Sequence, residues 1–273
     1  MTDYRAIDLA GMQPAQLASQ PAPQLMWIEI KDLVIDDRYQ RLLAEGNKRA
    51  ISKIAADFRW SRFSPVLVAP IEGGRYALID GQHRAHAAAL CGIERVPAMV
   101  ALVAPEEQAA AFIDVNTRQI RVSPHQIFRA ALLAGEDWAV RCREAVEAAG
   151  CRLMGSNANT ASKRPGQIYA IGLIRRMIEA HQEKAVTVGL TAMRKYDAGA
   201  IPNYSDALLT PWLGAVAATG AAVEELVEVL RSRRPWLVID AADRMAEADG
   251  KPKATMRRDF FIIAIQAGRE CVQ

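Results

Sequence analysis

The stretch YALIDGQHRAHAAALCGIERVPAMV, from Tyr76 to Val100, decides how the first part of the chain folds. Its opening apolar run, preceded by Arg75, has the length of a buried strand. An Asp-Gly pair ends that run, and an alanine-rich segment of high helix propensity follows. Gly92 is typical of the position just after a helix, and the next apolar run, Arg95–Leu102, predicts a second strand. Pro97 indicates that this second strand lies at a sheet edge or that it begins there.

Further elements are expected on both sides of this strand–helix–strand unit. Alternation predicts a strand at Met26–Ile30, and Ser64–Pro70 predicts another that a Gly-Gly turn joins to Arg75–Ile79. Pro105 and Pro124 stand at first helical positions, the latter after Ser123 as a helix-capping residue. Apolar spacing predicts the remaining helices at about 46–58, 137–149, 166–182, 184–196, 206–218, 221–232, 235–247 and 256–270.

These patterns define the expected fold class and domain organisation. We expect an α+β N-terminal domain with a small mixed sheet, followed by an all-α C-terminal domain. The expected limits are a flexible arm at 1–25, rich in Gln, Pro and Ala, the α+β domain at 26–130 and the helical domain at 131–273.

Composition narrows the functional classes. The 273 residues carry 34 basic and 31 acidic side chains, a net charge of +3, which gives no support to non-specific DNA binding. The four cysteines form no C-x-x-C pair, so neither a zinc site nor a disulfide framework is indicated, and a cytoplasmic setting fits. We find no signal pattern and no apolar stretch long enough to span a membrane, so no membrane partner is expected.

The residues Asp80–Arg84 carry the chemistry of the chain. A helix that starts directly after a strand-ending glycine directs free backbone N–H groups toward one point, which favours phosphate. Gly81 allows a ligand to approach the backbone, and the guanidinium of Arg84 suits phosphate oxygens. His83 can donate a hydrogen bond or move a proton, and Asp80 can cap the helix, orient His83 or hold a metal ion. The alternatives are a capped helix with solvated polar residues, or a metal site of Asp80, His83 and His86.

Four segments in the same order make residues 26–130 resemble the ParB/sulfiredoxin superfamily. Gly81-Gln82-His83-Arg84 with Ala87-Ala88, Cys91-Gly92-Ile93 and Val96-Pro97 is similar to the Gly-Glu-Arg-Arg helix and following strand of partition ParB proteins. Tyr39-Gln40, the strand that starts at Pro65, and the eight-residue spacing of Asn116 and Pro124 resemble further ParB segments.

The resemblance implies a nucleotide-binding domain with Mg²⁺, the nucleotide being CTP or ATP. It implies nucleotide contacts from Gln40, Pro65, Gly81, Gln82, His83, Arg84 and Asn116. The metal would be held by Asn116 and by Asp114, since the position of the family's metal-side Glu falls on Val115. The Asp-Gly-Gln-His-Arg run is also similar to a small-molecule kinase branch, in which case Asp80 and His83 serve phosphoryl transfer.

Gln82 is the main departure from the family. Sulfiredoxins have a catalytic cysteine there, and partition ParB proteins have a Glu linked to CTP hydrolysis, whereas Gln can only orient a water. The candidate catalytic residues are therefore Asp80, Gln82 and His83.

Three functions remain open from the sequence. The first is a nucleotide-binding, DNA-associated homodimer, as in partition or regulation of plasmids, phages or mobile elements. The second is an enzyme, either a nuclease or NTPase using Asp80, Asp114 and Asp36 or Asp37, or a small-molecule kinase. The third is a binding module without turnover. No clear helix-turn-helix is recognisable in the helical half, where basic residues that could meet DNA are Lys163-Arg164, Arg175-Arg176, Arg231, Arg233-Arg234 and those of 251–258.

Overall fold

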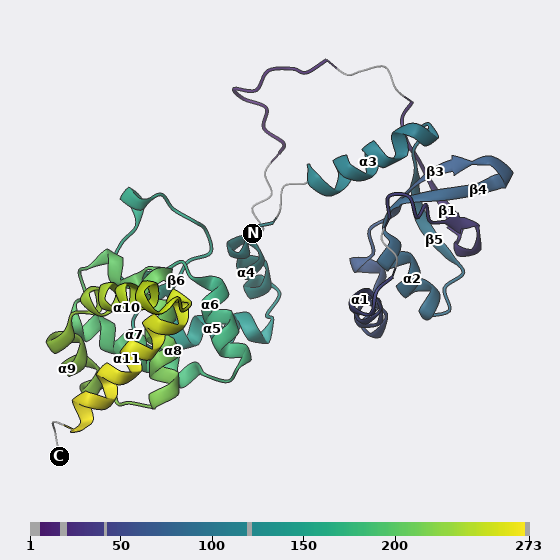
Figure 1. Ribbon diagram of the computed structural model, residues 1–273. Coiled ribbons are helices and arrows are strands. Elements are labelled where there is room, and N and C mark those ends of the chain that lie inside the picture. The colour runs from purple at the N-terminus through teal and green to yellow at the C-terminus, as the bar shows by residue number, and fades with distance from the viewer. Residues whose placement is uncertain (1–5, 17–20, 41–42, 119–121, 271–273) are drawn as a thin grey trace. The chain divides into compact units, whose positions relative to one another are not determined.

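The computed structural model describes residues 6–16, 21–40, 43–118 and 122–270. It divides into two units, Met1–Ile120 and Arg121–Gln273 (Figure 1). Residues 6–16 and 21–23, which lie in the expected arm, contain no helix or strand, and the rest of that arm lies outside the described residues. The helix Pro124–Leu133 (α4), which the sequence prediction placed largely before residue 131, falls in the second unit.

The first unit is built on a five-stranded sheet that is mixed, as the sequence predicted, although the short strand β2 was not expected. The strand order is β1-β5-β3-β4-β2, with β1–β5 and β3–β4 antiparallel and β3–β5 and β2–β4 parallel. Its elements are β1 (Gln24–Glu29), β2 (Leu33–Val34), α1 (Glu45–Ala56), β3 (Val66–Ile71), β4 (Arg75–Asp80), α2 (Gln82–Leu90), β5 (Arg95–Val100) and α3 (Pro105–Thr117).

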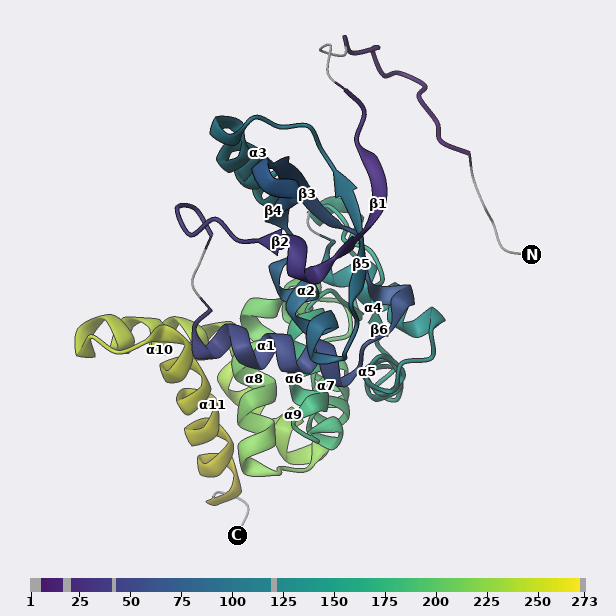
Figure 2. The ribbon, with the colours of Figure 1, turned by 90° about the vertical axis from the view of Figure 1, so that its right-hand side faces the viewer.

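Helices cover both faces of this sheet. Val66, Val68 and Leu78 pack with Ala85 and Ala88 of α2 on one face. On the other face the alternate residues Leu67, Ala69 and Ile79 pack with side chains of α3. The central strand β3 is therefore buried on both sides, which explains why it is apolar at every position from Val66 to Ala69 rather than alternating. Helix α1 lies beside α2 (Figures 1 and 2).

Pro97 does not mark an edge strand, so that expectation was wrong. Strand β5 lies between β1 and β3, and Pro97 is its third residue, opposite Trp27 of β1. Pairing with β3 begins only at Ala98. At Pro97 the strand therefore has a neighbour on one side alone, and the missing N–H of proline is tolerated there.

The second unit is largely helical. After α4 come α5 (Asp137–Glu147), α6 (Ile171–Glu179), α7 (Glu183–Tyr196), α8 (Asp206–Thr219), α9 (Val223–Arg233), α10 (Pro235–Asp249) and α11 (Lys253–Glu270). Ser123 caps α4 as expected, with its hydroxyl accepting from the amide of Gln126. The predicted helix 166–182 begins only at Ile171, because Gln167–Ile168 (β7) pairs in parallel with Arg152–Leu153 (β6). This short pair is the exception to an all-α domain.

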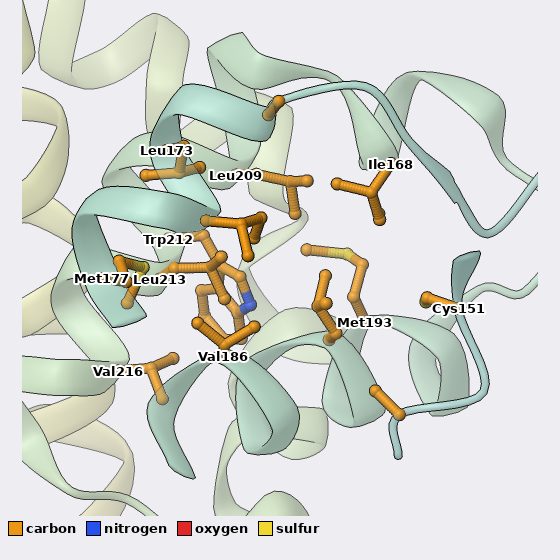
Figure 3. Packing of buried hydrophobic residues seen from close by; sticks show 14 of the residues in the cluster. Cys151, Ile168, Leu173, Met177, Val186, Met193, Leu209, Trp212, Leu213 and Val216 are labelled. Carbon is orange, nitrogen blue, oxygen red and sulfur yellow. The ribbon is translucent and has the colours of Figure 1, made fainter. Parts of the chain in front are cut away.

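The core of the second unit centres on α8. Trp212 is fully buried among apolar side chains that include Leu209, Leu213 and Val186 (Figure 3). Its indole N–H donates to the carbonyl of Gly189 at 2.9 Å, and its ring meets that of Phe261 edge-on with centroids 5.5 Å apart. Helices α7 and α8 approach closely at Gly189, where a Cβ atom would lie 2.5 Å from Leu213 Cδ2. The segment around Gly220 packs inward through α8 and α9. Among the described residues, no helix is long and apolar enough to cross a membrane.

The contact at Gly189 yields a stability prediction. Gly189→Ala should destabilise the helical unit by about 1–3 kcal/mol, because the new Cβ overlaps Leu213, which is fully buried in the core and must shift. Gly214→Ala is the matched control: its Cβ would meet only the flexible Arg258 side chain at 3.4 Å, so helix propensity should stabilise the protein by about 0.5–1 kcal/mol. Urea unfolding of the two variants measures both effects, and equal stabilities would contradict the packing shown here.

Candidate functional site

The turn between β4 and α2 consists of one residue with left-handed backbone angles, directly before the helix begins. Gly81 has φ 102° and ψ 18° and occupies the N-cap position of α2, with no side chain capping the helix. The first intrahelical bond runs from the N–H of Ala85 to the carbonyl of Gly81 at 2.9 Å. The N–H groups of Gln82, His83 and Arg84 precede it, so helix geometry leaves them free to bind an acceptor. The helix dipole adds partial positive charge at the same point.

Only glycine fits this turn. A Cβ at Gly81 would lie 2.7 Å from Val66 Cγ1 and 3.0 Å from Arg84 Nη2, in addition to the unfavourable positive φ. Val66 is fully buried in β3, so the backbone at Gly81 is held directly against the central strand. The core of the sheet thereby fixes the position of the free amides.

A cavity of about 280 Å³ opens in front of this turn. Its walls come from four elements that are distant in sequence: the segment after β2, α1, the β4–α2 turn and α3. The lining residues are Gln40, Asn47, Ile79, Asp80, Gly81, Gln82, His83, Arg84, Phe112 and Asn116. Thus Gln40, the whole run Asp80–Arg84 and Asn116 are brought together, while Pro65 and Asp114 do not line the cavity.

Arg84 folds back over the turn. Its Nη2 lies 3.1 Å from Asp80 Oδ2 and donates at 3.4 Å to the carbonyl of Pro65. Its Nε is buried and has no hydrogen-bond partner among the residues that the structure describes. Asp80 therefore neither caps α2 nor contacts His83 by a hydrogen bond in the described part of the chain, and its ion pair orients the guanidinium instead. Pro65 contributes through its backbone carbonyl.

Gln40 forms a buried polar wall of the cavity. Its side-chain amide donates to the carbonyl of Leu78 in β4, and its backbone N–H binds the carbonyl of Asp36 at 3.0 Å. The neighbouring Tyr39 packs against Phe112 with ring centroids 5.5 Å apart, and burial raises the pKa of its phenol. These contacts tie the segment after β2 to β4 and α3, which holds the cavity together.

The expected metal ligands separate in the structure. Asn116 lines the cavity and its amide donates to the carbonyl of Phe112 at 2.8 Å, whereas Asp114 forms an ion pair with Arg118 at 2.9 Å. Val115 packs against the sheet beside Leu67 and Ile79, so its position on α3 faces the core. Asp36, another candidate acid, is paired with Arg38. Asp80 is therefore the one carboxylate of the described residues that lines this cavity.

The histidines of α2 do not act together. His83 lines the cavity, but His86 does not, and its Nδ1 lies 2.7 Å from the carbonyl of Gln82 on its own helix. Within the described ranges, no group of three or more His, Cys, Asp or Glu side chains could hold a metal ion. The alternative metal site of Asp80, His83 and His86 is thus not assembled.

Sequence reasoning missed Asn47 and Phe112. Phe112 lies one helical turn before Asn116 on α3, and this spacing places both side chains on one face of the helix. Asn47 stands in the first turn of α1, and only the packing of α1 beside α2 brings it to the cavity. No local pattern in the sequence indicates that contact.

Comparison with known proteins identifies the first unit. Residues 29–117 match the family model of the ParB N-terminal domain. The fold and this match place that part of the chain in the ParB/sulfiredoxin superfamily. The match is confined to this part of the chain. Among curated protein sequences, none matches the chain.

Several solved structures are similar. ParB from Caulobacter crescentus complexed with CTP-γ-S is 13% identical, with 77% of this chain and 98% of that chain covered and a TM-score of 0.35. The same protein complexed to the centromeric parS site is 14% identical, with 76% and 99% covered and a TM-score of 0.29. The pNOB8-like ParB N-domain is 12% identical, with 84% and 82% covered and a TM-score of 0.31.

The strained turn yields the next prediction. Gly81→Ala should lower the stability of the first unit by about 1–3 kcal/mol, because the new Cβ meets buried Val66 and the backbone keeps a positive φ. Gly46→Ala is the matched control, since a Cβ there meets nothing within 4 Å and lies in the first turn of α1. Thermal unfolding measures both variants, and an unchanged midpoint for Gly81→Ala would show that the turn is not held as described.

Proposed function

We propose that the first unit binds a nucleoside triphosphate, with CTP as the first candidate, and that its phosphates lie at the start of α2. The observation that carries this proposal is the uncapped helix N-terminus at Gly81, with Arg84 folded over it, in the wall of a cavity. Free amides, the helix dipole and a guanidinium are the groups that proteins use for phosphate oxygens. The choice of CTP rests on the resemblance to ParB proteins.

The cavity is large enough to contact the phosphates and ribose of a nucleotide but too small to enclose the whole molecule. Ligand cavities are commonly about 300–1,000 Å³, and this one has about 280 Å³. We expect the base to contact the rim formed by Gln40 and Phe112. Tyr39, which precedes Gln40 in the chain, packs against the ring of Phe112 and so connects the two parts of the rim.

Mg²⁺ would be held mainly by the phosphates. This ion keeps several waters and takes one or two oxygen ligands from a protein in nucleotide sites. Asn116 can supply an amide oxygen at the cavity, and Asp80 can supply a carboxylate if its pair with Arg84 is shared with the ligand. Asp114 would have to leave Arg118 to contribute.

Binding is favoured over turnover. Gln82 cannot act as a carboxylate base, and the groups at the cavity that can accept a proton are His83 and Asp80, the latter paired with Arg84. A two-metal nuclease needs several converging carboxylates, whereas Asp80 is the one described at the cavity. We therefore propose a nucleotide-binding protein. Gln82 in place of the family's Glu favours a form that binds the nucleotide without hydrolysing it. Hydrolysis, nuclease or kinase activity is the second candidate.

We further propose that the protein associates with DNA as a homodimer in the cytoplasm, in partition or regulation of a plasmid, phage or mobile element. The support is the match of residues 29–117 to the family model of the ParB N-terminal domain. Fluorescence anisotropy of labelled duplex DNA, with and without CTP and Mg²⁺, tests this role. Phosphate release and DNA nicking in the same samples separate a DNA-bound switch from an enzyme.

Isothermal titration calorimetry with CTP, ATP and GTP, each with and without Mg²⁺, tests the cavity. Arg84→Ala should weaken binding of the preferred nucleotide by roughly tenfold to a hundredfold, because a charge-assisted hydrogen bond contributes about 1.5–3 kcal/mol. Its Asp80 partner is about one-third exposed, so the fold should tolerate the change.

Arg75→Ala is the matched control for that titration. Arg75 is exposed at the opposite end of β4, about 17 Å from Asp80 by strand geometry. Its replacement by alanine removes the same charge as Arg84→Ala does. Its nucleotide affinity should equal that of the unmodified protein. Equal affinities of all three proteins, or no heat with any nucleotide, would contradict the proposal.

A further inference from the structure

The helical unit contains a larger cavity, of about 1100 Å³, that the nucleotide proposal does not use. Four helices begin at its wall. The cavity is lined by residues of the first turn of α4, α6 and α10, and by Ser205 and Asp206 at the start of α8. Each of these helices is at least nine residues long.

Convergent helix N-termini make this cavity electropositive. Each N-terminus carries roughly half a positive charge on its unpaired N–H groups. Among the described residues, no side chain caps the N-termini of α6, α8 and α10. Backbone carbonyls bind the amides of Ile171, Leu208 and Leu237, and the amides of Gly172 and Asp206 are among those left for an outside acceptor. Ser205 occupies the N-cap of α8, yet its hydroxyl makes no capping bond. An anion in the cavity is the partner that such amides favour.

Two cationic side chains add to this field. Lys163 lies at the wall with its Nζ 4.7 Å from the centre of the Tyr169 ring, and Arg176 lies on the second turn of α6. Neither forms an ion pair with a residue of the described ranges. Among the described residues, Asp206 is the one carboxylate at the wall, and it accepts from the hydroxyl of Thr210 at 3.2 Å. The side chains alone therefore leave a net positive charge.

Buried polar atoms at the wall lack partners. Tyr204 is only 4% exposed, and its hydroxyl has no hydrogen-bond partner in the described part of the chain. The hydroxyl of Ser205 and Nε2 of His125 are likewise buried and unpaired there. An unsatisfied buried polar group costs about 1–3 kcal/mol. Three such groups around one cavity indicate that a ligand or ordered water completes them after small side-chain rotations.

Hydrogen bonds fix the aromatic part of the wall. Tyr169 donates from its hydroxyl to Gln167 at 3.0 Å. The indole N–H of Trp236 donates at 3.2 Å to Asn203, which is 3% exposed. The rings of Tyr169 and Trp236 therefore form apolar surface beside the charged groups, and a bare inorganic ion would leave that surface unused.

We propose that this cavity binds an organic oxyanion, a phosphate or carboxylate group on an aromatic body. The oxyanion lies at the starts of α6 and α8 with Lys163 and Arg176, and the body packs between Tyr169 and Trp236. This site is independent of the cavity in the first unit.

Calorimetric titration of the full chain with 1-naphthyl phosphate, 1-naphthoate and neutral 1-naphthol tests the proposal. At least one of the two anions should bind at least roughly tenfold more tightly than 1-naphthol, because the neutral compound gains nothing from the electropositive wall. The relative affinity of the two anions distinguishes a phosphate ligand from a carboxylate ligand. Arg84→Ala should leave these affinities unchanged, which separates this site from the first cavity. Equal binding of all three compounds, or none, would overturn the proposal.

Variants locate the bound anion. The double change Lys163→Gln and Arg176→Gln should weaken it by roughly tenfold or more, whereas Arg231→Gln, an exposed arginine on α9, should have no effect. Tyr204→Phe should weaken anion binding while raising the unfolding temperature of the free protein, because it removes an unsatisfied hydroxyl. If the double variant loses affinity for duplex DNA but keeps its affinity for the anions, the cations serve DNA and the proposal is wrong.

Discussion

The close packing of Gly81 against Val66 is the constraint on which the first unit depends. The left-handed backbone at Gly81 lets β4 end and α2 begin within one residue, with Val66 only 2.7 Å from where a Cβ would stand. A buried strand thereby fixes the first free amides of a helix. The side chain of Arg84 folds back over this turn, where Asp80 and the carbonyl of Pro65 hold its guanidinium. The phosphate site proposed at this point depends on packing rather than on any single reactive group.

Local sequence patterns predicted those features that depend on residues close together in the chain. The strand, the glycine turn and the alanine-rich helix follow from residues 75–92, and the mixed sheet with a helical region after it was confirmed. Ser123 caps its helix because the capping residues are neighbours in sequence. Gln40 and Asn116 were predicted as nucleotide contacts only through the resemblance to ParB proteins, since nothing near them in sequence indicates where they pack.

Long-range packing explains the rest. Asn47 reaches the cavity because α1 lies beside α2, and Asp114 points away from it because α3 places Val115 on the sheet. Pro97 is tolerated in an inner strand because β3 starts pairing one residue later. The late start of α6 depends on pairing of β7 with β6, a contact between segments that hydrophobic periodicity cannot reveal. In each case the deciding neighbour is distant in sequence.

Both units place uncapped helix N-termini at a cavity. In the first unit the cavity lies beside Arg84, and in the second it lies beside Lys163 and Arg176. The central claim concerns the first. Amide ¹H–¹⁵N chemical shifts of the labelled protein, recorded with CTP–Mg²⁺ and with cytidine, test it most directly. The account predicts that the amides of Gln82, His83 and Arg84 move downfield with CTP and not with cytidine. Unchanged shifts at these three amides under saturating CTP, with changes elsewhere, would contradict it.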